Sequence, residues 1–83
     1  MVDRIRVRKI LDELGIERLN RIKEARDEIG ITVEDLAKVC GISVGEMSMV
    51  ENELRIPNQI VIYRILRGFK KFGVNPHDIF TFY

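Results

Sequence analysis

The residues that most often carry chemistry in a protein are scarce in this chain of 83 residues. Cys40 and His77 are its only cysteine and its only histidine, and they lie far apart in the sequence. They offer no internal disulfide and no metal-ligand cluster, and the sequence shows no nucleophile–base pair or phosphate-binding loop. We therefore predict that the protein is not an enzyme and binds no metal and no cofactor, that Cys40 packs in a core, and that His77 faces solvent.

The chemistry that the sequence does offer is the binding of phosphate. The run from Arg4 to Lys9 carries four basic side chains, which could hold the phosphates of a nucleic acid through counterion release. The same run fits the solvent-facing side of an amphipathic helix, and both interpretations remain open. Charge gives no further help, because the net charge is only +1 and residues 32–54 hold one lysine against five carboxylates.

The apolar residues predict a single small helical domain. Hydrophobic residues make up 46% of the chain, enough for one core, and no apolar run is long enough to cross a membrane. No signal peptide is evident, so we expect a cytoplasmic protein without membrane contact. Apolar periodicity and residues typical of helix ends predict helices over about 3–14, 17–29, 33–40, 44–52 and 59–72, with a short last helix that ends near residue 80.

The first predicted helix has a competing interpretation. Residues 4–8 alternate basic and apolar side chains, which is typical of an edge strand. The helix is favoured because apolar residues from Val7 to Leu14 share one helical face. We therefore divide the chain into an N-terminal amphipathic extension, residues 1–16, and a helical domain, residues 17–83.

Two short capped helices, separated by a tight turn, form the part of this domain that fits DNA. Thr32 can accept the amide of Asp35 at the start of the first helix, and Ser43 can cap the second. Gly41 between them can take the left-handed conformation that a steep turn requires. The outer face of residues 44–52 would then form a convex ridge whose width fits the major groove.

The segments Arg26–Ser43 and Met47–Asn52, with Pro57 after them, resemble the Cro/phage-repressor class of helix-turn-helix domains, also called the xenobiotic-response-element class. The resemblance extends over about residues 19–80. It implies an all-α, five-helix repressor-like domain, to which this chain adds an N-terminal helix. It also implies that the second helix of the motif recognises double-stranded DNA, commonly as a homodimer on a two-fold operator.

The resemblance further implies roles for individual residues. Arg26 and Glu51 would form a buried ion pair that ties the first helix of the domain to the recognition helix. Val44, Gly45 and Met49 would face the edges of the bases. The residues that would lie on or near phosphates are Thr32, Ser43, Ser48, Asn52, Arg55 and Asn58.

Three features depart from the pattern of this family. Val33 stands where the family often has a glutamine that reaches the DNA backbone. Glu53 stands where the family prefers glycine, so either Glu53 takes the left-handed conformation or the recognition helix runs on. Val44, Gly45 and Met49 cannot make bidentate hydrogen bonds to bases, which leaves contacts with thymine methyl groups and readout of DNA shape.

These observations predict a sequence-specific DNA-binding transcription regulator, a repressor that binds a two-fold operator through residues 44–52. The alternative is a protein-interaction module on the same fold, an antitoxin or an anti-repressor whose acidic recognition face meets a basic protein partner. Four residues fit that alternative better than they fit DNA: Val44, Glu46, Met49 and Glu53.

The C-terminal residues are apolar, and a domain this small has little room to bury them. They either pack on their own core or form a contact between two copies. We predict the second, a symmetric homodimer with Phe72, Phe80, Phe82 and Tyr83 near its interface.

Overall fold

The computed structural model describes residues 4–80, and residues 1–3 and 81–83 lie outside the described part of the chain. The elements are α1 (Arg4–Glu13), α2 (Ile22–Ile29), α3 (Val33–Cys40), α4 (Val44–Glu51), α5 (Gln59–Lys70) and the 3-10 helix η1 (Pro76–Asp78). Residues 4–80 contain no strand, only one isolated bridge between Asn20 and Phe80. The predicted all-α fold is confirmed, and residues 4–8 belong to a helix.

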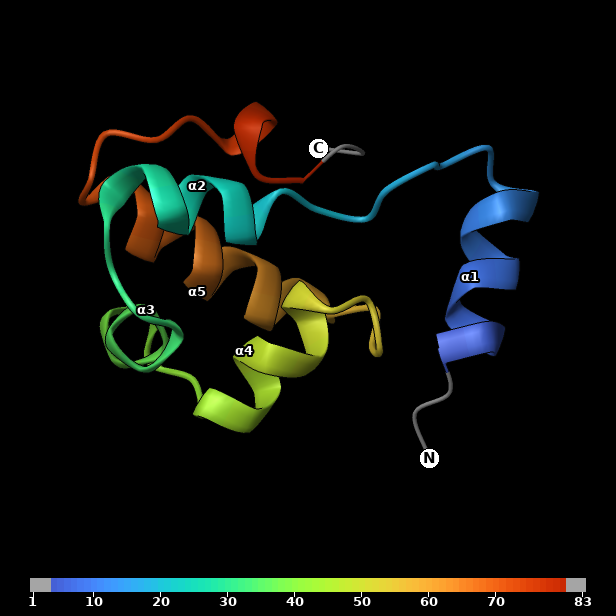
Figure 1. The fold of residues 1–83 in the computed structure, drawn as a ribbon, viewed down its shortest axis with the longest axis horizontal. Coiled ribbons are helices and arrows are strands. Elements are labelled where there is room, and N and C mark those ends of the chain that lie inside the picture. The colour runs from blue at the N-terminus through green and yellow to red at the C-terminus, as the bar shows by residue number, and fades with distance from the viewer. Residues whose placement is uncertain (1–3, 81–83) are drawn as a thin grey trace.

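The helices α2 to α5 share one hydrophobic core, which we call the main core. In the view of Figure 1, α2 lies above α5, α3 and α4 lie below it, and α1 stands apart on the right. The fully or nearly buried residues of the main core are Ile22, Ala25, Leu36, Ala37, Cys40, Met47, Val50, Ile65, Phe69, Ile79 and Phe80.

A glycine permits the close contact between α3 and α5. A Cβ on Gly68 would overlap the Cys40 Sγ and would lie 3.3 Å from the Cys40 Cα. The buried Cys40 thiol donates to the carbonyl oxygen of Ile65, with 3.8 Å between the two atoms. Burial raises the pKa of this thiol to about 11, so Cys40 is a neutral core residue, as predicted.

The second predicted helix begins later than expected, at Ile22. The cause is Asn20, a buried polar residue whose side chain bonds in two directions. Its Nδ2 donates to the Val50 carbonyl at 2.8 Å, and its Oδ1 accepts the Ile22 amide at 3.0 Å. Because the first bond joins residues far apart in sequence, helical periodicity does not reveal this boundary.

A second, smaller cluster holds α1. Val7, Leu11 and Leu19 are buried in it, and Ile16 packs partly against them; we call this the satellite cluster. The apolar face predicted for residues 3–14 is only half buried, because Ile10 is 38% exposed and Leu14, just after the end of α1, is 66% exposed.

The C-terminal aromatic residues divide between core and surface. Phe80 is buried in the main core of its own chain, so it is not available for the dimer interface at which it was predicted. Phe72 is 39% exposed. The predicted positions of Phe82 and Tyr83 lie outside the described residues.

Candidate nucleic-acid interface

The helices α3 and α4 form a capped pair joined by a tight turn. The Thr32 Oγ1 accepts the Asp35 amide at 3.1 Å, and the Ser43 Oγ accepts the Glu46 amide at 3.0 Å. Gly41 in the turn has a φ of +74°, which glycine adopts without steric cost. The caps therefore fix where both helices begin, and Gly41 forms the turn between them.

The outer face of α4 is narrow and apolar. Met47 and Val50 are buried and hold the helix against the main core. Val44 is 42% exposed and Met49 is half-buried. A Cβ built on Gly45 would meet nothing closer than the Ser43 Oγ at 4.0 Å, so this position is open to an approaching ligand.

Hydrogen-bonding groups surround this apolar ridge. Asn58 is exposed and caps α5, since its Oδ1 accepts the Val61 amide at 2.9 Å. The Asn52 Nδ2 donates to the Ser48 carbonyl at 2.8 Å and lies 3.4 Å from the Ser48 Oγ. Val33, where the related family often has glutamine, packs against the main core and does not extend this polar rim.

Arg26 and Glu51 meet inside the domain. The Arg26 Nη2 lies 2.9 Å from the Glu51 Oε1, and the two side chains are 16% and 7% exposed. The Arg26 Nη1 also donates to the Ile31 carbonyl at 3.1 Å. The hydrogen bond from Glu51 raises the pKa of Arg26. This pair ties α2 to α4, so Glu51 points away from the surface that would meet a ligand.

Arg55 does not stand free on the surface, although it was predicted to lie near a phosphate. Its Nη1 lies 2.7 Å from the Glu46 Oε1, so the exposed arginine folds back on the recognition helix. No short-range sequence signal joins residues nine positions apart across a turn, and sequence reasoning missed this pair.

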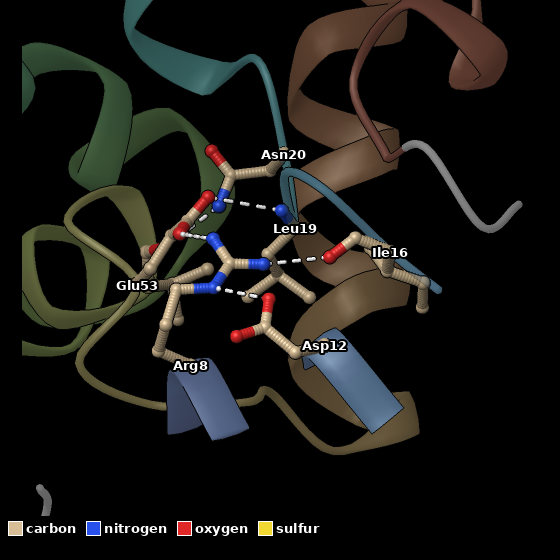
Figure 2. A network of polar contacts seen from close by, with 7 residues as sticks. Arg8, Asp12, Ile16, Leu19, Asn20 and Glu53 are labelled. Atoms are coloured by element: carbon tan, nitrogen blue, oxygen red, sulfur yellow. Dashed lines mark hydrogen bonds and ion pairs between the residues drawn. The ribbon is translucent and has the colours of Figure 1, made fainter. Parts of the chain in front are cut away.

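Glu53 takes the left-handed conformation, and α4 does not run on. Its φ is +59°, and among residues 4–80 it is the only residue other than glycine with a positive φ. Figure 2 shows its carboxylate directed at Arg8 of α1 and at the Leu19 amide, at 3.3 and 2.9 Å. The family's preference for glycine pointed to this position, but the contact with α1 was not predicted.

These three ion pairs change the charge balance of residues 32–54. The sequence places five carboxylates against one lysine in residues 32–54. Glu46, Glu51 and Glu53 are each paired with an arginine that lies outside that segment. The tertiary structure therefore compensates much of the negative charge that argued against an anionic ligand.

Two further classes of site were searched for in the described part of the chain. Between Arg4 and Phe80, no group of three or more His, Cys, Asp or Glu side chains could hold a metal ion. No helix in that stretch is both long and apolar enough to cross a bilayer.

A family model described as helix-turn-helix, of the Cro/C1 type and xenobiotic-response-element class, matches residues 22–71. The matched stretch covers more than half of the chain. It contains α2 to α5 and leaves α1 outside. Comparisons with curated proteins and with solved structures gave no match.

Proposed function

Because the chain belongs to the Cro/C1-type helix-turn-helix family of DNA-binding transcription regulators, we propose that it is a sequence-specific repressor that reads a two-fold operator with α4. We also propose that it acts in the cytoplasm, the location expected for a DNA-binding regulator of this family. The observation that carries the proposal is the open side of α4. It presents Val44 and Gly45 outward, and its carboxylates are paired with arginines.

Affinity would come mainly from the phosphates. The capping oxygens of Thr32, Ser43 and Asn58 accept helix amides, which leaves their own hydroxyl or NH2 groups able to donate to a phosphate. Each of these residues also stands at the positive end of a helix dipole. Arg55 would add a charged contact once it leaves Glu46.

Sequence preference would come from apolar contacts. Val44 and Met49 can touch thymine methyl groups, and Gly45 lets the backbone of α4 approach the base edges closely. We therefore expect T at the contacted steps of each half-site, with the remaining preference set by DNA shape.

A two-fold operator requires two copies of the chain. The centres of half-sites on one face of DNA lie about 34 Å apart, and the longest dimension of this molecule is 33 Å, so one copy suits one half-site. We propose a symmetric homodimer that buries Phe72 together with Ile60 and Tyr63, which are exposed apolar residues of α5. Analytical ultracentrifugation that shows only monomer at high concentration would contradict the dimer.

The alternative is a protein-interaction module in which the recognition face meets a basic partner. Its support was the apolar pair Val44 and Met49 together with the acidic residues of this face. The acidic part of that support is weakened, because Glu46 and Glu53 are already paired with arginines of the same chain. DNA therefore remains the ligand that this surface supports best.

Selection of DNA from a random pool, followed by fluorescence anisotropy on the selected duplex, tests the proposal. Gly45→Glu should abolish binding because it places a carboxylate against the groove, while the space around Gly45 leaves stability nearly unchanged. Lys23→Ala, an exposed change on α2, is the matched control. If folded Gly45→Glu protein binds the selected duplex as wild type does, α4 does not read DNA and the protein-interaction module takes its place.

A further inference from the structure

Glu53 occupies a backbone conformation that glycine would take more easily. Its φ of +59° brings the Cβ of an L-residue close to its own backbone. A glutamate in this conformation is strained, and the contacts of its side chain act against that strain. Those contacts are all directed to the N-terminal part of the chain, namely to Arg8 and to the Leu19 amide.

Arg8 connects three segments through one guanidinium group (Figure 2). Its Nε bonds Asp12 on its own helix at 3.1 Å, and its Nη2 bonds the Ile16 carbonyl after that helix at 2.6 Å. Its Nη1 lies 3.3 Å from the Glu53 Oε2 at the end of the recognition helix. The network therefore fixes both the position of α1 and its rotation about its own axis.

The apolar contacts of α1 are too few to do this alone. The satellite cluster buries only Val7, Leu11 and Leu19, and it lies outside the main core. A small cluster of this kind holds a helix against the domain but specifies its rotation weakly. The carboxylate of Glu53 supplies the directional contacts that the cluster lacks.

α1 is anchored next to residues that belong to the proposed DNA surface. Glu53 lies directly after Asn52 and two residues before Arg55. In Figure 1 α1 stands apart from α4, and the turn that follows α4 extends toward α1. Arg6 and Lys9, in this basic half of α1, are exposed.

We propose that Glu53 is a positioning residue that holds α1 beside the recognition helix, so that Arg6 and Lys9 contact the DNA backbone next to the site that α4 reads. This inference rests on the proposed DNA binding. It makes α1, which lies outside the matched helix-turn-helix region, a second part of the DNA-binding surface.

The first arm of the test measures α1 without DNA. Glu53→Gly removes the carboxylate and relieves the positive φ, so the turn should still form. Amide hydrogen exchange, followed by mass spectrometry, should become at least about tenfold faster in α1 and stay unchanged in α3 to α5. Glu53→Gln keeps an acceptor for the Leu19 amide and should restore part of the protection. Unchanged exchange of α1 in Glu53→Gly would overturn the positioning role.

The second arm measures the salt dependence of binding to the selected duplex. The double variant Arg6→Ala/Lys9→Ala should make the slope of log K against log salt less negative by about 1.8 for each bound copy of the chain, since each lost phosphate contact removes about 0.9. Glu53→Gly should reduce the magnitude of the slope by a similar amount, and combining all three changes should add little. The control Lys23→Ala/Lys70→Ala removes two exposed charges from α2 and the end of α5 and should leave the slope unchanged.

The outcomes separate the two proposals. Wild-type protein that binds no duplex contradicts the proposed function itself, and the contact made by α1 falls with it. If the wild-type protein binds and the Arg6→Ala/Lys9→Ala variant has the same salt slope as wild type, the contact by α1 is overturned and the proposed function stands. The contact by α1 is likewise overturned if the Arg6→Ala/Lys9→Ala variant and the Lys23→Ala/Lys70→Ala control give the same salt slope.

Discussion

Two glutamates at the end of the recognition helix, Glu51 and Glu53, lie two residues apart and hold different parts of the molecule. Glu51 pairs with Arg26 of α2, and the side chains are 7% and 16% exposed. Glu53 pairs with Arg8 of α1, and the side chains are 20% and 36% exposed. The first pair lies within the family's helix-turn-helix region, and the second fastens an added helix to it.

This difference shows that burial determines how much stability is lost when one partner of an ion pair is removed. Removal of one partner from a buried pair leaves a charge in the interior without compensation. Removal of one partner from a partly exposed pair lets water replace it, so little stability is lost. We therefore expect Glu51 to support the fold and Glu53 to support the position of α1.

The largest effect is expected at the buried pair. Glu51→Ala and Arg26→Ala should each lower the free energy of unfolding by about 3–5 kcal/mol, measured by urea denaturation followed by circular dichroism. Replacement of both residues with apolar side chains of similar size should cost much less. If either alanine variant unfolds at the wild-type urea concentration, the pair does not support the fold.

The second-largest loss of stability is expected inside the main core, away from both ion pairs. Gly68→Ala forces α5 away from Cys40, and overpacking of this kind costs about 1–3 kcal/mol, partly offset by the better helix propensity of alanine. The same urea titration measures it. Stability equal to wild type would show that α3 and α5 can separate without loss.

Glu53→Gly should change global stability by less than about 1 kcal/mol, because relief of the left-handed strain offsets the loss of a partly exposed ion pair. Its comparison with Glu51→Ala tests the contrast directly, since each variant removes one carboxylate from the same short segment. Equal losses of stability in the two variants would remove the distinction between them.

The ion pair between Arg55 and Glu46 should affect DNA binding more than stability. Glu46→Gln should release Arg55 for a phosphate and strengthen DNA binding up to about fivefold, because a partly exposed pair contributes at most about 1 kcal/mol. Anisotropy titration of the selected duplex measures the change. Arg55→Ala should remove the gain, and an unchanged affinity in Glu46→Gln would show that Arg55 does not meet DNA.

The last prediction concerns Cys40, which reports on the main core. Its thiol pKa is raised from 9.0 to about 11, so its contribution to stability is fully present below pH 9.0 and is lost as the pH rises through about 11. Alkylation by iodoacetamide at about pH 8 should require global unfolding. The rate in Glu53→Gly should stay within about fivefold of wild type, and the rate in Glu51→Ala should rise strongly. Fast alkylation of the wild type would contradict this burial.

Much of the fold and part of the site followed from local signals. The caps at Thr32, Ser43 and Asn58 and the turn at Gly41 lie where their sequence context predicts them, because such bonds join residues three or four positions apart. The predicted start of α2 was too early in the sequence, because the Asn20 side chain donates to the Val50 carbonyl, thirty residues away. The homodimer and the DNA contacts of individual residues stay predictions.

The sequence by itself determined the helices, their caps and the family, because each depends on short-range spacing or on the type of residue in a motif. Only the tertiary structure decided which charges meet. Arg8 and Glu53 are 45 residues apart, and Arg55 could as well have stood free in solvent as against Glu46. Such pairs depend on how whole helices pack, and no local pattern records that. Packing thus decides that the carboxylates of an acidic segment are largely compensated and that α1 is tied to the turn after the recognition helix.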